Sequence, residues 1–256
     1  MPPASEIPDG IVSCALPAGE DLFAELSRSV RWEDVGKGRR GAVLTRVDEA
    51  GGVPLVRTTT RYGSPAQRFR PVHERLARRV RERAGLPFGF NNALVERYTN
   101  AYTTMGSHCD QALDLADDSF IAVFSCYEHP DAGPPRKLVF ESKESRGERF
   151  EIPLVHHGVV AFSTGSNRHL RHRIVLERPV PTADNTWLGV TFRTSKTFVR
   201  FHGGHGHLSR GTRLALADEE QRSEFYALRR RENRETDFAY PPLAYTVSES
   251  DLMPPV

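Results

Sequence analysis

A run of short β-type segments between residues 90 and 201 constrains the fold of this chain most strongly. The segments read ALVERY, FIAVFSCY, KLVFES, RFEIPLV, GVVAFS, LRHRIVLE and TWLGVTFR. Clusters of Pro, Gly, Asp and Asn separate them, and no helical periodicity lies between them. Strands this short, without intervening helices, are typical of a sandwich or barrel and not of βαβ units. The sequence therefore predicts a mainly β (α+β) protein.

Helical patterns lie outside this run. Residues 20–28 predict a short amphipathic helix. The clearest helix starts at Pro71, repeats Val72, Leu76 and Val80 at a spacing of four, and ends at Gly85. A third, charged helix is expected over residues 217–232.

The 256 residues correspond to one large domain or two small ones. We expect an N-terminal preamble packed on the core over residues 1–56, a β core domain over 57–201 and a C-terminal extension over 202–256. Within the preamble, Gly51-Gly52 separates two strand-like segments, AVLTRV and VPLVRTT, and predicts a hairpin turn between them.

Composition predicts a soluble cytoplasmic protein. No apolar run is long enough to span a bilayer, and the N-terminus lacks the basic and apolar regions of a signal peptide. Three cysteines, an odd number, argue against a disulfide scaffold and favour a reducing compartment.

The charge is nearly balanced overall but uneven along the chain. Thirty-five basic and 33 acidic residues give a net charge of +2, too small to predict a nucleic-acid partner. However, nine arginines lie between Arg57 and Arg83, with only two glutamates among them. This cluster is either a surface for phosphates or an acidic substrate, or simply a solvated helix face.

Two histidines and an aspartate form the main candidate metal site. His108 and Asp110 are two apart in GSHCDQ, on a predicted strand or its end, so their side chains should share one face. A third candidate ligand, His172, follows Asp110 by 62 residues in NRHLRHRIV. Two imidazoles and one carboxylate on one face of a metal are typical of non-haem Fe(II) oxygenases, and leave coordination sites open for a co-substrate and O2.

Other histidines offer alternatives. A shift in strand register would make His169 the ligand in place of His172. The HGGHGH segment, with His202, His205 and His207, could bind zinc. Because no cysteine or acidic residue lies near that segment, a flexible loop is the preferred interpretation.

The stretch FNNALVERYTNAYTTMGSHCDQ resembles the AlkB-like Fe(II)/2-oxoglutarate dioxygenases, whose pattern is approximately FN-x-x-L-x-N-x-Y, ten residues, then H-x-D. Here Phe90-Asn91, Leu94 and Tyr98 match, and His108 follows Tyr98 by ten residues. The resemblance continues through SFIAVFSCYE, KLVFESKESRGE and LVHHGVVAFSTGSNRHLRHRI, and closes on TWLGVTFR. It covers about residues 60 to 195.

This resemblance implies a double-stranded β-helix, that is a jelly-roll core with helices packed on one side. Residues 57–201 would then form the dioxygenase domain. The implied ligands of Fe(II) are His108, Asp110 and His172, with His172 preferred over His169. The implied co-substrates are 2-oxoglutarate and O2.

The resemblance also implies Tyr98 and Arg193 as contacts for 2-oxoglutarate, because an arginine pairs well with a carboxylate. The chain departs from the family nearby: Glu96 stands where an Asn is usual, and Trp187 and Gly189 replace the first Arg and the Asn of R-x-N-x-T-F-R. One of two expected carboxylate-binding arginines is therefore missing. The candidates to replace it are Arg171, Arg173 and Arg178.

The substrate is expected to be a small molecule. The acidic residues that often follow H-x-D in the DNA-repair members are replaced here by Gln111, Ala112 and Leu113. The segment between residues 63 and 71 is too short for a full nucleotide-recognition lid. Two alternatives stay open: an AlkB-type nucleic-acid demethylase, using the Arg57–Arg83 cluster, and a non-catalytic binding protein that retains the fold.

Overall fold

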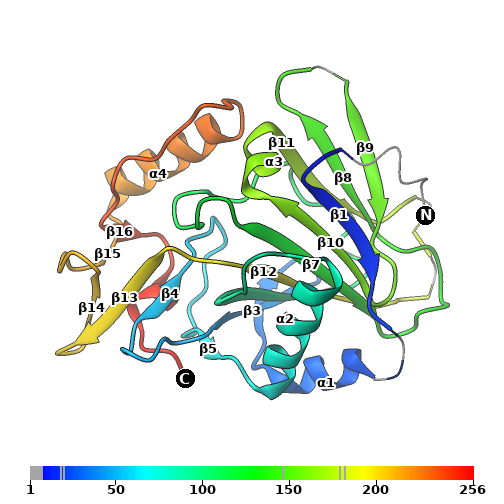
Figure 1. Cartoon of the computed structure of the whole chain (residues 1–256), viewed down its shortest axis with the longest axis horizontal. Helices are drawn as coiled ribbons and strands as arrows, with labels where there is room; N and C mark the ends of the chain where they lie inside the picture. The colour runs from blue at the N-terminus through cyan, green and yellow to red at the C-terminus, as the bar shows by residue number, and fades with distance from the viewer. Residues whose placement is uncertain (1–7, 18, 20, 146, 179, 182) are drawn as a thin grey trace.

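The computed structural model describes residues 8–17, 19, 21–145, 147–178, 180–181 and 183–256 (Figure 1). The described part is mostly antiparallel β-structure, as the short segments predicted. Its helices are α1 (Leu22–Ser29), α2 (Pro71–Arg83), α3 (Thr164–His169), α4 (Glu219–Glu232) and the 3-10 helix η2 (Glu249–Leu252).

The main sheet has the strand order β1-β10-β7-β12-β6-β3-β2, with the short β5 paired beside β3. Its members are β1 (Ile11–Ala15), β2 (Glu33–Gly36), β3 (Arg39–Thr45), β5 (Gln67–Arg68), β6 (Asn92–Tyr98), β7 (Phe120–Tyr127), β10 (Gly158–Ser163) and β12 (Trp187–Arg193). Residues expected to form a preamble packed on the core thus supply β1, β2 and β3 to the sheet itself. The proposed division into 1–56, 57–201 and 202–256 stays a prediction.

A smaller antiparallel sheet, of order β11-β8-β9, forms the second layer. Its strands are β8 (Lys137–Ser142), β9 (Arg149–Pro153) and β11 (Leu170–Val175). A buried apolar cluster lies between the two sheets. Tyr98, Val123 and Trp187 of the main sheet belong to it together with Phe140 and Ile174 of the smaller sheet. The predicted jelly-roll is confirmed.

The opposite face of the main sheet carries the helices, also as predicted. Because side chains alternate along a strand, residues such as Val95 and Leu188 point away from the inter-sheet cluster. They pack instead against Leu26 of α1 and Leu76 and Val80 of α2. Figure 1 shows α1 and α2 together on this side. Because α1 and α2 cover this face of the main sheet, the face toward the smaller sheet is the one available for a site.

The hairpin predicted at Gly51-Gly52 is wrong. Strand β4 (Val53–Leu55) does not pair with β3 but with β13 (Thr197–His202), in a separate sheet of order β14-β13-β4. The Asp48 carboxylate accepts a hydrogen bond from the backbone N–H of Gly52 at 2.6 Å. This local turn redirects the chain away from β3.

The expected HGGHGH loop is also replaced by regular structure. Strand β13 and β14 (His205–Leu208) form an antiparallel hairpin through Gly203 and Gly204, whose φ angles are 56° and 80°. Positive φ at both turn residues favours glycine and suits a tight hairpin.

The C-terminal extension is fastened to the core by a buried arginine. The Arg57 guanidinium donates to both carboxylate oxygens of Asp114, at 2.8 and 3.0 Å. It also donates to the backbone carbonyls of Leu243 and Tyr245. The parallel pair β15 (Ala215–Leu216) and β16 (Tyr245–Thr246) lies in this extension. Arg57 is therefore a structural member of the arginine cluster.

All three cysteines are free thiols, as expected. Among the described residues, no helix is both long enough and apolar enough to cross a membrane.

Candidate metal centre

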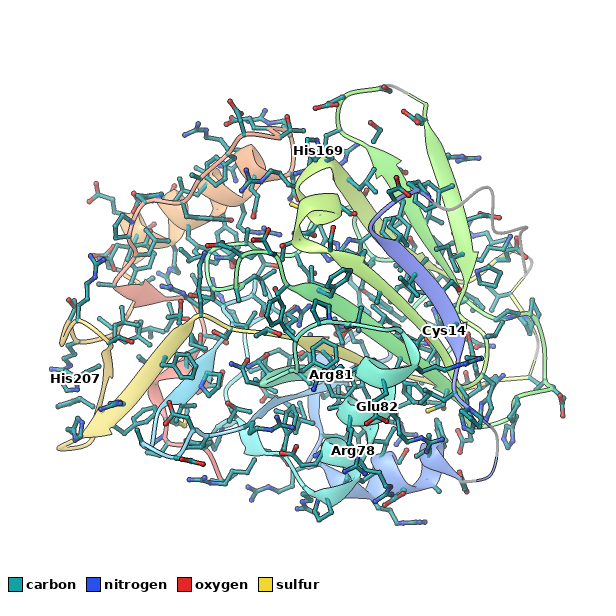
Figure 2. All side chains as sticks on the ribbon, in the orientation of Figure 1. Cys14, Arg78, Arg81, Glu82, His169 and His207 are labelled. Carbon is teal, nitrogen blue, oxygen red and sulfur yellow. The ribbon has the colours of Figure 1, made fainter. Side chains whose placement is uncertain are left out.

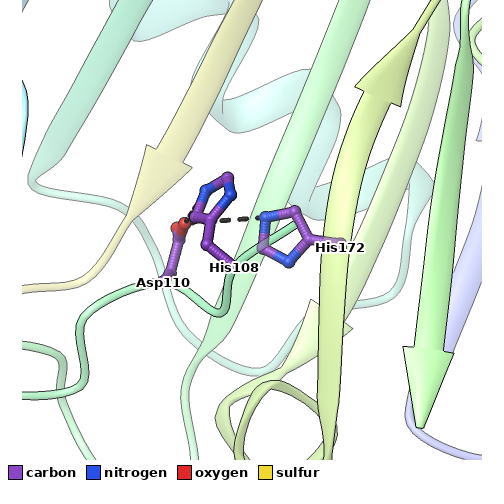
Figure 3. Close-up of side chains that lie close together, drawn as sticks. All are labelled: His108, Asp110 and His172. Carbon is purple, nitrogen blue, oxygen red and sulfur yellow. Dashed lines mark ion pairs between the residues drawn. The ribbon is translucent and has the colours of Figure 1, made fainter. Parts of the chain in front are cut away.

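His108, Asp110 and His172 meet at one point of the structure. Their potential ligand atoms all lie within 4.8 Å of one another, which is compatible with binding one metal ion. The Nε2 atoms of His108 and His172 are 3.8 and 3.7 Å from Asp110 Oδ1, and Figure 3 shows the three side chains converging. Among the described residues, this is the one group of His, Cys, Asp and Glu with that arrangement.

A single β-bridge brings the two histidines together. His108 lies in the loop before β7, and its backbone N–H donates to the His172 carbonyl at 3.0 Å. The His172 N–H donates back to the His108 carbonyl at 2.6 Å. Directly paired residues of an antiparallel bridge place their side chains on the same side. The two imidazole rings accordingly lie 4.7 Å apart.

The loop is fixed on its other side by Asn167 of α3. The Asn167 amide accepts from the Asp110 N–H at 2.7 Å and donates to the Asp110 carbonyl at 2.8 Å. Asn167 is buried, so this double contact fixes the backbone of the acidic residue.

The aspartate is held as an anion. Burial raises the pKa of Asp110, but the Arg193 guanidinium lowers it to well below its usual value. Arg193 Nε donates to Asp110 Oδ2 at 2.6 Å. This contact leaves Oδ1 facing the two histidines. An oriented carboxylate of this kind is typical of a metal ligand supported by its surroundings.

The histidines are held neutral, the form that binds metals. Burial lowers the pKa of His172 to about 3, and the nearby His108 adds to this effect. Burial also lowers the pKa of His108, against the opposing effect of the Asp110 carboxylate. The Gly106 carbonyl accepts a hydrogen bond from His108 Nδ1 at 2.9 Å, which leaves Nε2 as the free nitrogen.

The alternative histidines lie elsewhere. His169 is exposed at the end of α3, where it is 3.4 Å from the Glu144 carboxylate, and Figure 2 shows it at the surface. In the β13–β14 hairpin the rings of His202 and His207 are 6.2 Å apart. Across the part of the chain that the structure describes, these histidines join no group able to hold a metal.

A cavity of about 340 Å³ opens beside the three residues. Its walls are contributed by the main sheet, by the segment 56–60 and by the loop 105–111. The lining includes Arg39, Arg57, Thr60, Glu96, Tyr102, His108, Asp110, Gln111, His172, Thr191, Arg193 and Arg229. The side-chain amide of Gln111 is buried in this wall, and neither of its polar atoms has a partner within the part of the chain that the structure describes. Such an unpaired buried amide is unusual in a native structure.

Of the two residues expected to contact 2-oxoglutarate, Arg193 lines the cavity and Tyr98 lies beneath it. Tyr98 is fully buried against Trp187, with a ring-centroid distance of 4.7 Å. Its hydroxyl donates to Glu96 Oε2 at 2.8 Å, and the other oxygen of Glu96 accepts from Arg39 Nε at 2.8 Å. The unexpected glutamate is thus paired with a cation from β3.

Trp187 and Gly189 form one unit. A Cβ atom added at Gly189 would lie only 2.0 Å from Cη2 of the Trp187 ring. The indole therefore fills the space above residue 189 on the inner face of β12. The candidate replacements for the missing arginine lie elsewhere: Arg171 and Arg173 approach Glu141 at 3.8 and 3.0 Å, and Arg178 is exposed.

Helix α4 contributes residues that the sequence did not single out. Glu232 accepts a hydrogen bond from the Ala112 N–H at 2.8 Å, and Asn233 accepts one from the Cys109 N–H at 2.9 Å. Arg229 donates to the Cys109 carbonyl at 2.8 Å. The C-terminal extension therefore holds the loop that carries His108 and Asp110. In the sequence this region is marked only by the expected charged helix over residues 217–232, and the charge pattern does not reveal which loop the helix contacts.

Comparison with known proteins agrees with this fold and site. No family model matches the chain. It is 32% identical over 117 residues to the DNA oxidative demethylase ALKBH2 of Mus musculus, covering 43% of this chain and 46% of the relative. The corresponding protein of Homo sapiens is 30% identical over 117 residues, with 43% and 42% covered. The matches thus span less than half of these curated relatives.

Among solved structures, the structure of OsALKBH1 superimposes with a TM-score of 0.50 at 15% identity, covering 73% of this chain and 98% of that one. This likeness shows the fold alone, and the His-Asp-His group lies at the cavity within that fold. The predicted resemblance to the AlkB-like family is confirmed by the ALKBH2 matches.

Proposed function

We propose that the protein is an Fe(II)- and 2-oxoglutarate-dependent dioxygenase that hydroxylates, or oxidatively dealkylates, a small molecule in the cytoplasm. One observation carries the proposal: two neutral imidazoles and one ionised carboxylate converge beside an open cavity. When bound, the iron and 2-oxoglutarate supply the oxidation by O2, with release of succinate and CO2.

The residues present fit an iron(II) ion. His108 and His172 would each bind through Nε2, and Asp110 through Oδ1, the atoms that already face one another. Arg193 holds the remaining oxygen of the aspartate and so orients the carboxylate. The cavity wall shields the site from bulk water on the side of the inter-sheet cluster.

A small substrate is favoured over a nucleic acid by the chemistry beside the site. The three residues after Asp110 are uncharged, and Gln111 brings to the cavity wall a buried amide that has no partner among the described residues. The second candidate is a nucleic-acid demethylase, which the name of the ALKBH2 relatives favours. The third candidate is a non-catalytic binding protein, in which the three candidate ligands would not bind iron.

Succinate formation tests the proposed function. We expect protein supplied with Fe(II), 2-oxoglutarate and O2 to release succinate. The rate of release should rise when the true substrate is added from a panel of metabolites and oligonucleotides. His172→Ala should abolish this activity, because it removes one of three ligands. His169→Ala is the matched control and should retain it, since His169 lies at the surface.

Anaerobic binding separates the enzyme from a silent binding protein. Addition of Fe(II) and 2-oxoglutarate should produce a visible metal-to-ligand charge-transfer band. If the wild-type protein gives neither this band nor succinate, the dioxygenase proposal is wrong.

A further inference from the structure

A dicarboxylic 2-oxo acid bound in the cavity requires a cation to pair with its second carboxylate. A dicarboxylic 2-oxo acid carries a distal carboxylate, and burying that charge without a partner is costly. Position 187 offers an indole in place of a guanidinium, and the Trp187 ring closes the space there. The partner must therefore come from another residue that lines the cavity.

Four arginines line the cavity, and each of them is paired with a carboxylate. Arg57 binds Asp114 and two carbonyls of the C-terminal extension. Arg193 binds the candidate iron ligand Asp110. Arg229 binds Glu232 and the Cys109 carbonyl.

Arg39 differs from these three in its exposure. Its side chain is 17% exposed, compared with 3% for Arg57, 8% for Arg193 and 7% for Arg229. Arg39 lines the cavity together with Thr60, whose hydroxyl accepts from the Arg39 NH2 group at 2.8 Å. The Arg39 guanidinium is therefore the one of the four with most room to receive a ligand.

The register of the sheet places Arg39 next to the missing position. Arg39 on β3 is paired with Tyr98 on β6, and Tyr98 is paired with Trp187 on β12. Side chains of directly paired residues lie on the same face of a sheet. The guanidinium thus stands two strands away from position 187, on the same inner wall.

Arg39 and Tyr98 already bind one carboxylate, that of Glu96. One of its oxygens accepts from Arg39 Nε and the other from the Tyr98 hydroxyl, each at 2.8 Å. The Glu96 side chain is only 8% exposed, so the pair is largely desolvated. A guanidinium has five N–H donors, so Arg39 can pair with a second carboxylate without releasing the first.

Building on the proposed function, we propose that Arg39 binds the distal carboxylate of the 2-oxo acid in place of the arginine expected at position 187. Glu96 is a positioning residue that holds the guanidinium at the cavity wall. Arg39 lies outside the region of family resemblance, which begins at about residue 60.

A pair of ligands tests this assignment. Anaerobic protein loaded with Fe(II) is titrated with 2-oxoglutarate and with 2-oxopentanoate, in which a methyl group replaces the distal carboxylate. The charge-transfer band reports binding, and calorimetry with Mn(II) gives a second measurement. We expect the wild-type protein to bind 2-oxoglutarate roughly 10- to 100-fold more tightly, as for one charge-assisted pair.

Arg39→Gln should remove this preference, because it lowers the affinity for 2-oxoglutarate and leaves the affinity for 2-oxopentanoate unchanged. Arg40→Gln is the matched control, because Arg40 is the next residue of the strand and its side chain is 60% exposed beside Asp34. Arg39→Gln leaves Glu96 without its cation and threatens folding. The double variant Arg39→Gln/Glu96→Gln removes both charges and should fold while also lacking the preference.

The outcomes distinguish the two proposals. Wild-type protein that binds both acids equally, or variants without Arg39 that keep the preference, would overturn the assignment of Arg39 while leaving the dioxygenase intact. Wild-type protein that binds neither acid in the presence of metal contradicts the dioxygenase itself, and the assignment with it.

Discussion

At the residue scale, the buried imidazole of His73 is held in one protonation state by its hydrogen bonds. Its Nδ1 accepts a hydrogen bond from the Arg70 N–H at 3.0 Å, at the start of α2. Ser29 Oγ donates to the Leu26 carbonyl, so His73 Nε2, 2.7 Å away, must be the donor to Ser29. The network therefore requires the neutral imidazole, with its proton on Nε2.

This arrangement predicts a pH-dependent stability. Burial, with a smaller effect of Arg70, lowers the pKa of His73 from 6.5 to about 4. Between these values the unfolded state binds more protons than the folded state, so the free energy of unfolding falls as pH drops from 6.5 to 4. The full loss is roughly 3 kcal/mol.

Urea denaturation across this pH range checks the prediction. His73→Asn removes the titrating group, so the difference in unfolding free energy between wild type and variant should shrink by that amount as the pH falls. Curves that stay parallel from pH 7 to pH 4 would show that His73 is not the responsible group.

Single residues were predictable from sequence only where a motif names them. His108 and Asp110 share a short motif, and the family resemblance implied His172. Arg39 and Glu96 are 57 residues apart, and nothing local to either indicates their pairing. Such contacts follow from the register of β3 on β6, which depends on the whole sheet.

At the scale of elements, helix α4 acts on the candidate metal centre through its C-terminal end. The side chain of Asn233 accepts from the Cys109 N–H, midway between His108 and Asp110. Lys143, the residue after the end of β8, adds a link by donating to the Glu232 carbonyl at 2.6 Å. The element is distant in sequence from the loop that it supports.

Removing this support should weaken metal binding. We expect Asn233→Ala to lower the affinity for Mn(II) by about tenfold, since residues that orient metal ligands have effects of this size. Glu219→Ala, at the exposed start of α4, is the control and should leave the affinity unchanged. Equal affinity in Asn233→Ala, with the same circular dichroism and melting temperature, would show that the loop is held without α4.

Elements were predictable where the pattern is local. The segments from ALVERY to TWLGVTFR all became strands, and Pro71 begins the predicted helix α2. The hairpin between β3 and β4 failed because the pairing of β4 depends on β13, about 140 residues further along the chain. A Gly-Gly pair marks a turn but does not choose the partner strand.

At the scale of the whole molecule, the arginine cluster is divided by the sheet. Arg57 is buried on the side of the extension, whereas the arginines of α2 lie behind the main sheet, away from the cavity. Several of these bind the N-terminal segment: Arg75 pairs with Glu25, and Arg83 donates to the Ala15 carbonyl. Figure 2 shows Arg78 and Arg81 on this helix. The cluster therefore does not form one surface around the candidate site.

This distribution predicts weak binding of nucleic acid. A single-stranded oligonucleotide should show no saturable binding at 150 mM salt, because few of these cations can contact a strand that reaches the cavity. Fluorescence anisotropy between 50 and 200 mM salt measures this directly. Tight binding with a steep salt dependence would favour the demethylase over the small-molecule enzyme.

The contact of Trp187 with Gly189 restricts how this part of the chain can vary. A side chain at position 189 and an indole at position 187 exclude each other, since the added Cβ would overlap the ring. In any lineage leading from an arginine and an asparagine to this pair, the asparagine must be lost first or together with the arginine. Tryptophan at 187 in a related chain should then always be accompanied by glycine two residues later, a covariation readable from sequences alone.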